Sequence, residues 1–178
     1  MIRVVLTVLL AVALLAVSLP ALDDARTETT ADRIGAEAER IEHAAAALTV
    51  DSVAVNEATL AARDSLVVRA PGGFGAAPID DLTLVNVDSE RIDEARIDRD
   101  GGSVGAEAAS GALDADVALT YRLRGGPLRA IPIPNPADTI ELAVVDGPIA
   151  LQTTGESRIE LRFVTTERGA AIRLSRVG

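Results

Sequence analysis

The sequence predicts an α+β protein, in which an N-terminal transmembrane helix continues into an amphipathic helical stem and a mainly antiparallel β-sheet domain follows. Three observations predict this fold class. The chain opens with a long uncharged aliphatic run, the next segment has apolar residues at helical spacing, and beyond it hydrophobic residues alternate with polar ones. We therefore divide the chain into an anchor at 1–22, a stem at 23–49 and an extracytoplasmic β-rich domain at 50–178.

Composition limits the chemistry that the chain can perform. A length of 178 residues is enough for one membrane element and one modest domain. The absence of cysteine excludes disulfides, thiolate nucleophiles and cysteine-based zinc sites. Because His43 is the only histidine, a metal site with several histidines is excluded within one chain.

The charge balance is strongly acidic. All 17 basic residues are arginines, and they stand against 27 acidic residues, which gives a net charge of −10. Such a surface repels nucleic acid, so we expect no nucleic-acid partner. The composition is typical of haloarchaeal proteins, which stay hydrated at high salt, and an acidic protein encoded in GC-rich DNA is the alternative.

The first predicted element is the membrane anchor. The 19 residues from Val4 to Leu22 carry no charge and would span about 28 Å as a helix, close to the thickness of the hydrocarbon layer. Arg3 precedes the run and two aspartates follow it, which predicts a single-pass protein of the cell membrane with a cytoplasmic N terminus. The side chains expected in the lipid bilayer are Val4, Leu9, Leu10, Leu14, Leu15 and Leu19.

A cleaved signal peptide is the alternative interpretation of the same run. Signal peptidase requires small residues at −3 and −1, and a cut after Ala21 would place Leu19 at −3. A cut after Ser18 satisfies the size rule but leaves Pro20 at +2. The run therefore favours a retained anchor, with at most a kink at Pro20 before the stem.

The stem is predicted from an apolar stripe with spacings of three and four residues. The stripe consists of Ile34, Ala38, Ile41, Ala45 and Leu48. Two interpretations stay open: a plain spacer helix, or a stem whose stripe packs on a sheet or on another subunit. In the second case, glutamates in place of Ala38 and Ala45 are expected to break assembly. His43 points away from the stripe, so we expect it in solvent rather than in a catalytic role.

The β-rich domain is predicted from alternation and turn signals. VALTYRLRG and RIELRFV, which begin at Val117 and Arg158, show the clearest alternation, with Arg158 and Arg162 outward. The C-terminal strands are predicted to form an antiparallel meander with turns at Asp146–Gly147 and near Gly169. The predicted strands cover 65–69, 82–88, 117–123, 139–145, 149–153, 158–164 and 171–177.

The remaining segments of the domain predict loops rather than sites. Residues 101–111 (GGSVGAEAASG) are expected to form a mobile loop, and IPIPNP at 131–136 a sheet-edge or polyproline stretch. The acidic turn at 98–101 lacks the ligands of a calcium loop, and the glycines at 72–75 lack the lysine of a phosphate loop. We therefore predict no catalytic, cofactor-binding or metal-binding residues and no small-molecule substrate.

The opening stretch MIRVVLTVLLAVALLAVSLPALDDAR, with its acidic helix and β-rich tail, resembles a family of uncharacterised haloarchaeal membrane proteins that carry a domain of unknown function. Genes of that family tend to lie beside components of archaeal type IV pili or secretion ATPases. The layout also resembles type IV pilins and pseudopilins, although no charged leader precedes the apolar run and no glutamate lies near its start.

The resemblance implies a non-enzymatic, membrane-anchored structural or assembly component, of the accessory or minor-pilin-like kind, in an archaeal type IV pilus or secretion system. Its partners would be the lipid bilayer and other subunits of that assembly. The alternative is an anchored or secreted binding module whose ligand meets the loop at 101–111. An anchored hydrolase is the third interpretation, and it requires a pocket in which carboxylates converge.

Overall fold

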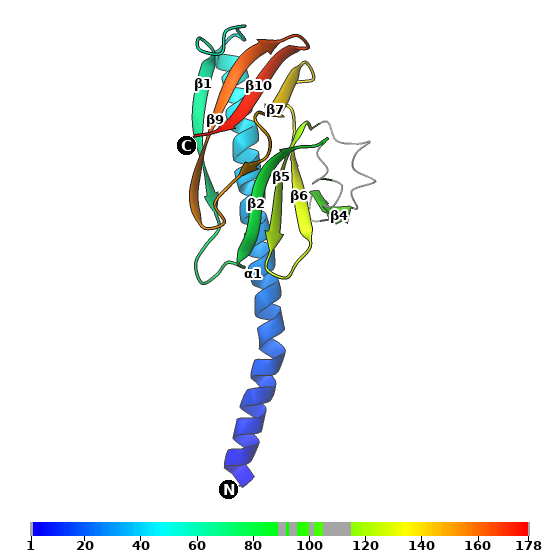
Figure 1. The fold of residues 1–178 in the computed structure, drawn as a ribbon. Helices are drawn as coiled ribbons and strands as arrows, with labels where there is room; N and C mark the ends of the chain where they lie inside the picture. The colour runs from blue at the N-terminus through cyan, green and yellow to red at the C-terminus, as the bar shows by residue number, and fades with distance from the viewer. Residues whose placement is uncertain (1, 89–91, 93–95, 100–101, 105–114, 178) are drawn as a thin grey trace.

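The fold consists of one long helix and two β-sheets (Figure 1). The computed structural model describes residues 2–88, 92, 96–99, 102–104 and 115–177. Helix α1 covers Ile2–Asp51, and its N-terminal half projects beyond the sheets (Figure 1). The strands are β1 (Ala62–Ala70), β2 (Ile79–Asn86), β3 (Arg96–Arg99), β4 (Gly102–Val104), β5 (Val117–Leu123), β6 (Leu128–Ile133), β7 (Ile140–Val144), β8 (Ile149–Ala150), β9 (Gly155–Thr166) and β10 (Gly169–Arg176).

The predicted transmembrane helix is the main correction to the expected fold class. Among the residues that the structure describes, no helix combines the length and the apolar character needed to cross a membrane. The predicted anchor and stem form one uninterrupted helix of 50 residues that continues through Pro20 and past the aspartates at 23–24. The predicted continuation of the run into the stem agrees with this helix, but its prediction as a transmembrane helix was wrong, and the fold is mainly β, with two sheets and one helix.

The strands form two sheets rather than one meander. One sheet has the order β1-β9-β10-β7 and the other the order β4-β3-β6-β5-β2-β8. Only β9 and β10 form the expected C-terminal hairpin, since β7 pairs in parallel with β10 and β8 pairs with β2. The predicted turn between β7 and β8 does exist, with φ angles of 64° at Asp146 and 86° at Gly147. Strand β7, before the turn, nevertheless belongs to the four-stranded sheet, and β8, after it, belongs to the six-stranded sheet. Both strands contribute side chains to the same core.

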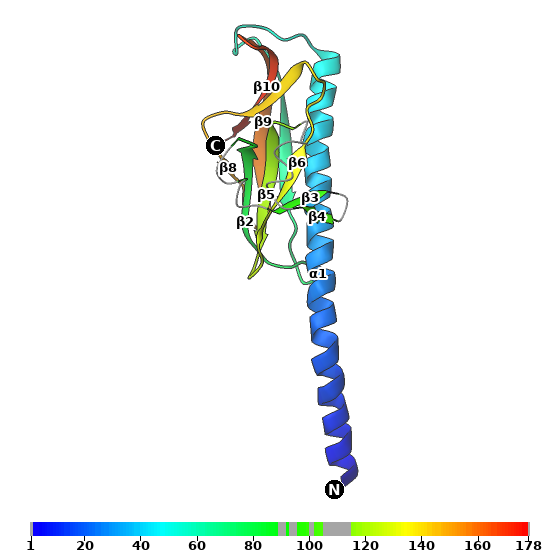
Figure 2. The same ribbon diagram turned by 90° about the vertical axis from the view of Figure 1, so that its right-hand side faces the viewer.

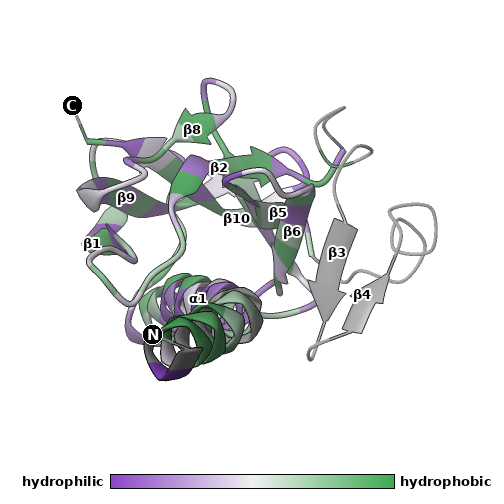
Figure 3. Ribbon diagram, turned by 90° about the horizontal axis from the view of Figure 1, so that it is seen from below, coloured by the Kyte–Doolittle hydropathy of each residue, from purple (hydrophilic) through white to green (hydrophobic). Residues whose placement is uncertain are grey.

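Helix α1 closes this core from one side (Figure 2). It contacts β1 and β9 of the first sheet and β6 of the second, and Figure 3 shows it lying across both sheets when viewed along its axis. Ile34 and Ile41 are packed in one cluster with Leu119, Leu161 and Ile172, which come from both sheets. Burial of such aliphatic side chains stabilises a fold by roughly 1.5–3 kcal/mol each, so the helix is an integral part of the domain.

Two further segments differ from their predicted structure. Only residues 131–133 of the proline-containing stretch belong to a strand, as the end of β6 in the six-stranded sheet, and Pro132 pairs with Ala118 of β5. Strand β3 pairs with β6 only at Arg129 and Ala130, so the missing N–H of Pro132 lies beyond that pairing. Part of the predicted acidic turn belongs to β3 and part of the predicted mobile loop is β4, while residues 100–101 and 105–111 lie outside the described residues.

Candidate interaction surfaces

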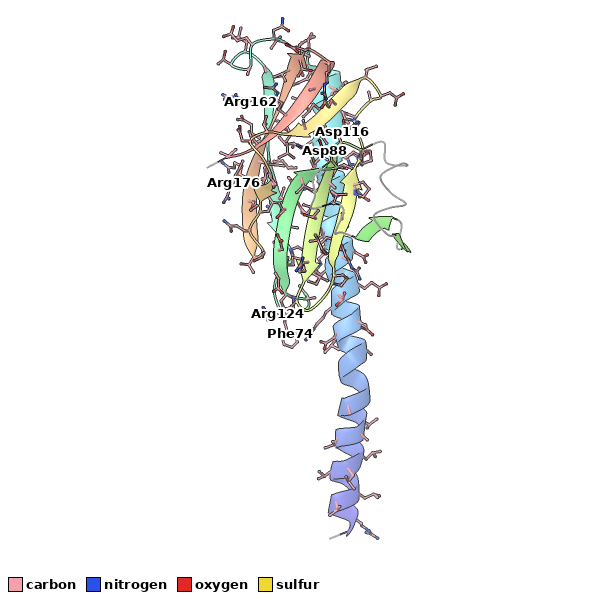
Figure 4. All side chains as sticks on the ribbon, turned by 45° about the vertical axis from the view of Figure 1, so that its right-hand side comes forward. Phe74, Asp88, Asp116, Arg124, Arg162 and Arg176 are labelled. Atoms are coloured by element: carbon pink, nitrogen blue, oxygen red, sulfur yellow. The ribbon has the colours of Figure 1, made fainter. Side chains whose placement is uncertain are left out.

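Between Val5 and Leu14, the described side chains of the projecting half of α1 are apolar apart from Thr7. Its exposed aliphatic side chains are Val5, Leu6, Val8, Leu9, Leu10, Val12, Leu14 and Leu22, each between 47% and 68% exposed. Because successive helix positions differ by about 100°, these side chains surround the helix (Figure 4). Three predicted anchor residues, Leu9, Leu10 and Leu14, belong to this surface; the side chains of Val4, Leu15 and Leu19 lie outside those that the structure describes.

The apolar stripe of the predicted stem lies in the core of the same chain. Ile34, Ala38, Ile41 and Ala45 are at most 3% exposed, and Leu48 is partly buried against the same cluster. Small alanine side chains let the helix approach the sheets closely. Of the two packing partners expected for the stripe, the structure has the protein's own sheets, so these side chains are not available to another subunit.

A buried hydroxyl marks the point where α1 reaches the sheets. The Oγ1 atom of Thr30 donates to the carbonyl of Arg26 (2.8 Å) and accepts from the N–H of Ala77 (2.8 Å) in the loop between β1 and β2. In the same loop Phe74 is 92% exposed, and the guanidinium of Arg26 lies 5.0 Å from the centre of its ring (Figure 4). A cation–π contact of this kind holds the loop against the helix where the projecting half begins.

Replacing Thr30 by valine is expected to lower the free energy of unfolding by about 1–3 kcal/mol, because the partly buried N–H of Ala77 would lose its acceptor. Valine keeps the shape of threonine, so packing is retained. Thr29→Val is the matched control, since the Thr29 hydroxyl bonds only to its own helix and is exposed. Urea denaturation of both variants measures the difference, and equal loss in the two would contradict this role for Thr30.

Polar contacts secure the next turns of the helix to β1. Oε2 of Glu37 accepts a hydrogen bond from the N–H of Arg69 (3.2 Å), and both carboxylate oxygens of Glu37 accept from Arg40 (2.8 Å each). The Arg69 guanidinium in turn bonds to Glu156 of β9 (2.9 Å). His43 is exposed and its Nδ1 donates to the carbonyl of Glu39 (2.7 Å), so its one polar contact stays within the helix.

The outer face of the β1-β9-β10-β7 sheet carries a group of arginines, Arg63, Arg158, Arg162 and Arg173, that we call the arginine face. Arg162 lies opposite Arg63 of β1 and also opposite Arg173 of β10, so three of them form a row across three strands. Arg162 bonds to the carboxylate of Glu160 on its own strand. Figure 4 shows Arg162 on the side of the sheet that faces away from α1.

The sequence does not predict the arginine face, although its alternation predicts that Arg158 and Arg162 point outward. Alternation fixes which side of a strand a residue occupies, but the row of three arginines depends on the register between β1, β9 and β10. No pattern within one segment of the sequence contains that register.

An open groove of about 730 Å³ adjoins the arginine face at the end of the same sheet. Its lining includes Asn56, Glu141, Thr166, Arg168 and Arg173. The carboxylate of Glu141 lies 4.0 Å from the Arg168 guanidinium. Across the described part of the chain, no group of three His, Asp or Glu side chains gathers closely enough to hold a metal ion.

Comparison with known proteins assigns the chain to a family, but it finds no similar protein of known activity. Neither the curated proteins nor the solved structures contain a significant match to it. A family model described as a domain of unknown function (DUF7311) matches residues 1–177, which is almost the whole chain. The helix and both sheets are therefore parts of one family domain, and the protein belongs to the DUF7311 family.

Proposed function

We propose that this protein is a non-enzymatic structural or assembly subunit, of the accessory or minor-pilin-like kind, in an archaeal type IV pilus or secretion system. The projecting half of α1 is the observation that carries the proposal. A helix that is apolar on all sides is normally buried by neighbouring elements, and here the sheets of the same chain leave it uncovered. Such a surface marks a site of association.

The energy available from covering this segment is large. Burial of a single leucine or valine side chain contributes roughly 1.5–3 kcal/mol, and eight exposed side chains of these types lie on the projecting half. Ala13 and Ala16 are exposed between them and would let another helix approach closely. We infer that helices of neighbouring subunits pack around this segment.

The two halves of α1 support a division of roles. The second half is held in the domain core by Ile34, Ile41 and Ala45, so the β-sheets are rigidly attached to the projecting half. An assembly built on the projecting half would therefore display the β-sheets at its surface. The chain resembles pilins and pseudopilins in the order of its parts. An apolar helix comes first, an amphipathic continuation of that helix follows, and β-structure comes last. Placement in the cell membrane with a cytoplasmic N terminus stays a prediction.

A triple variant of the projecting half tests the proposal. Leu6→Gln, Leu9→Gln and Leu10→Gln together remove apolar surface at side chains that are 68%, 61% and 61% exposed, so the β-domain should stay folded. In cell fractions of the native host, the unaltered protein is expected to co-sediment with pilus or secretion subunits, identified by mass spectrometry. The triple variant is expected to leave those fractions, with at least about a tenfold loss of co-sedimenting protein.

The matched control replaces exposed aliphatic side chains at the other end of the helix and after it. It combines Val50→Gln, Val53→Gln and Leu60→Gln, which are 83%, 80% and 74% exposed. Association should be unchanged in this control. If the projecting-half variant associates as fully as the control, the structural role is contradicted, and the alternative of a binding module is favoured.

A further inference from the structure

The arginine face is an island of positive charge on an acidic protein. The outer face of the β1-β9-β10-β7 sheet holds five arginines, the four of the arginine face and Arg69, against three glutamates at 141, 156 and 160. The whole chain has the opposite balance, with 17 arginines against 27 acidic residues. This sheet face has an excess of positive charge, although the molecule as a whole is negative. Such a local excess points to a partner with negative charge.

Most of this positive charge is not neutralised within the chain. Arg63, Arg158 and Arg173 are exposed and form no ion pair among the described residues. Neighbouring strands lie about 4.8 Å apart, so the row of Arg63, Arg162 and Arg173 brings like charges together. Like charges directly opposite each other destabilise a sheet. Carboxylates from a partner would remove this repulsion.

The same chain carries a complementary surface on α1. Glu28, Asp32, Glu39 and Glu42, which we call the acidic ridge, follow one another at spacings of four, seven and three residues and so share one side of the helix. The first three are exposed and Glu42 is half-buried, and none forms an ion pair with another described residue. The ridge extends over about 21 Å, at ~1.5 Å per residue.

The two surfaces cannot meet within one molecule. Leu161 and Ile172 alternate along β9 and β10 with the arginines and point into the core beneath α1, so the arginine face is on the opposite side of the sheet. The acidic ridge flanks the buried stripe on α1, and its residues Glu28, Asp32 and Glu39 are exposed. Each surface is therefore accessible only to another molecule.

We propose that the arginine face of one protomer binds the acidic ridge on α1 of a second copy of this chain. The contact joins two different surfaces, so it is heterologous, and contacts of this type propagate into rings or filaments. An open groove lined by Arg168 and Arg173 lies at the end of the same face. The proposal deepens the proposed structural role, on which it rests, by naming a lateral contact between β-domains that is separate from the projecting half.

Charge reversal in the full chain tests this contact. All proteins carry Leu6→Gln, Leu9→Gln and Leu10→Gln, so that the projecting half does not contribute to association. One variant reverses the sheet with Arg63→Glu, Arg158→Glu and Arg173→Glu. A second variant reverses the helix with Glu28→Arg, Asp32→Arg and Glu39→Arg. Self-association is measured by sedimentation velocity at one ionic strength, for each protein alone and for an equimolar mixture.

The protein with both native surfaces is expected to self-associate, and each reversal alone should weaken association by at least about tenfold. Mixing the two variants should restore association, because each supplies the partner for the surface that the other has reversed. The neutral variant with glutamine at the same three arginines guards against misfolding and should weaken association less than the reversal does. Circular dichroism confirms that each protein is folded.

Association that survives either reversal, or a mixture that fails to associate, would overturn the proposal. Binding of poly-glutamate to the native arginine face without self-association would assign the face to a different acidic protein and would also overturn it. Every protein in this experiment carries the glutamine substitutions on the projecting half. A failure of the proposed contact between β-domains would therefore not contradict the proposed function, which is tested through the projecting half.

Discussion

Replacing Ala45 by glutamate is expected to detach the second half of α1 from the sheets and to lower the free energy of unfolding by roughly 4 kcal/mol or more. Ala45 is fully buried and lies in the cluster that includes Ile41 and residues of both sheets. A carboxylate there would be desolvated without a partner, and four extra side-chain heavy atoms would have no space. Thermal unfolding monitored by circular dichroism should show the loss as a fall in Tm of about 8 °C or more.

Ala36→Glu and Ala47→Glu are the matched controls for this substitution. Both alanines are exposed on the same helix, so glutamate there should change stability by no more than about 0.5 kcal/mol. If Ala45→Glu were as stable as these controls, the helix could not be packed as described. The sequence alone led us to expect that glutamates at Ala38 and Ala45 would break assembly, and the structure assigns the primary effect to the fold of the chain.

Replacing Asn86 by leucine is expected to lower the free energy of unfolding by about 2–4 kcal/mol, because two hydrogen bonds between the sheets would be lost. The side-chain amide of Asn86, at the end of β2, pairs with the backbone of Val144 in β7. Its Nδ2 donates to the Val144 carbonyl (3.2 Å), and its Oδ1 accepts from the Val144 N–H (2.8 Å). Leucine would leave both backbone groups of Val144 without partners.

The variant Asn86→Asp distinguishes the contributions of the two hydrogen bonds to stability. Aspartate keeps the acceptor for the Val144 N–H but cannot donate to its carbonyl, so the loss should be smaller than with leucine. Urea denaturation of both variants measures the order. Hydrogen exchange should also become faster at the amide of Val144 in the leucine variant. Unchanged exchange at Val144 would show that Asn86 does not hold the sheets together.

The junction between the sheets explains why the C-terminal topology differs from the predicted meander. The turn at Asp146–Gly147 has the backbone expected from its sequence, yet β7 continues beside β10 and β8 beside β2. A turn fixes the reversal of the chain over a few residues, whereas the choice of neighbouring strand depends on which sheet buries the apolar side chains. Leu142, Val144 and Ile149 all enter the shared core, and this common burial divides the strands between two sheets.

The arginine face and the stripe of α1 show the same distinction between pattern and packing. The spacing of Ile34, Ala38, Ile41 and Ala45 was visible in the sequence, because the helical period depends only on residue order. Whether that stripe packs on the protein's own sheets or on another subunit depended on the three-dimensional arrangement. The row of Arg63, Arg162 and Arg173 depended on strand register in the same way.

The sequence by itself determined the apolar run, the helical period after it, the alternation that marks the longer strands and the acidic, cysteine-free composition. These features depend on neighbours along the chain, so local spacing and residue chemistry are sufficient to predict them. Only the tertiary structure decided that the stripe of the helix is buried beneath two sheets, and that four arginines gather on the outer face. These features come from contacts between residues far apart in the chain, and their energies depend on burial and register, which no single segment contains.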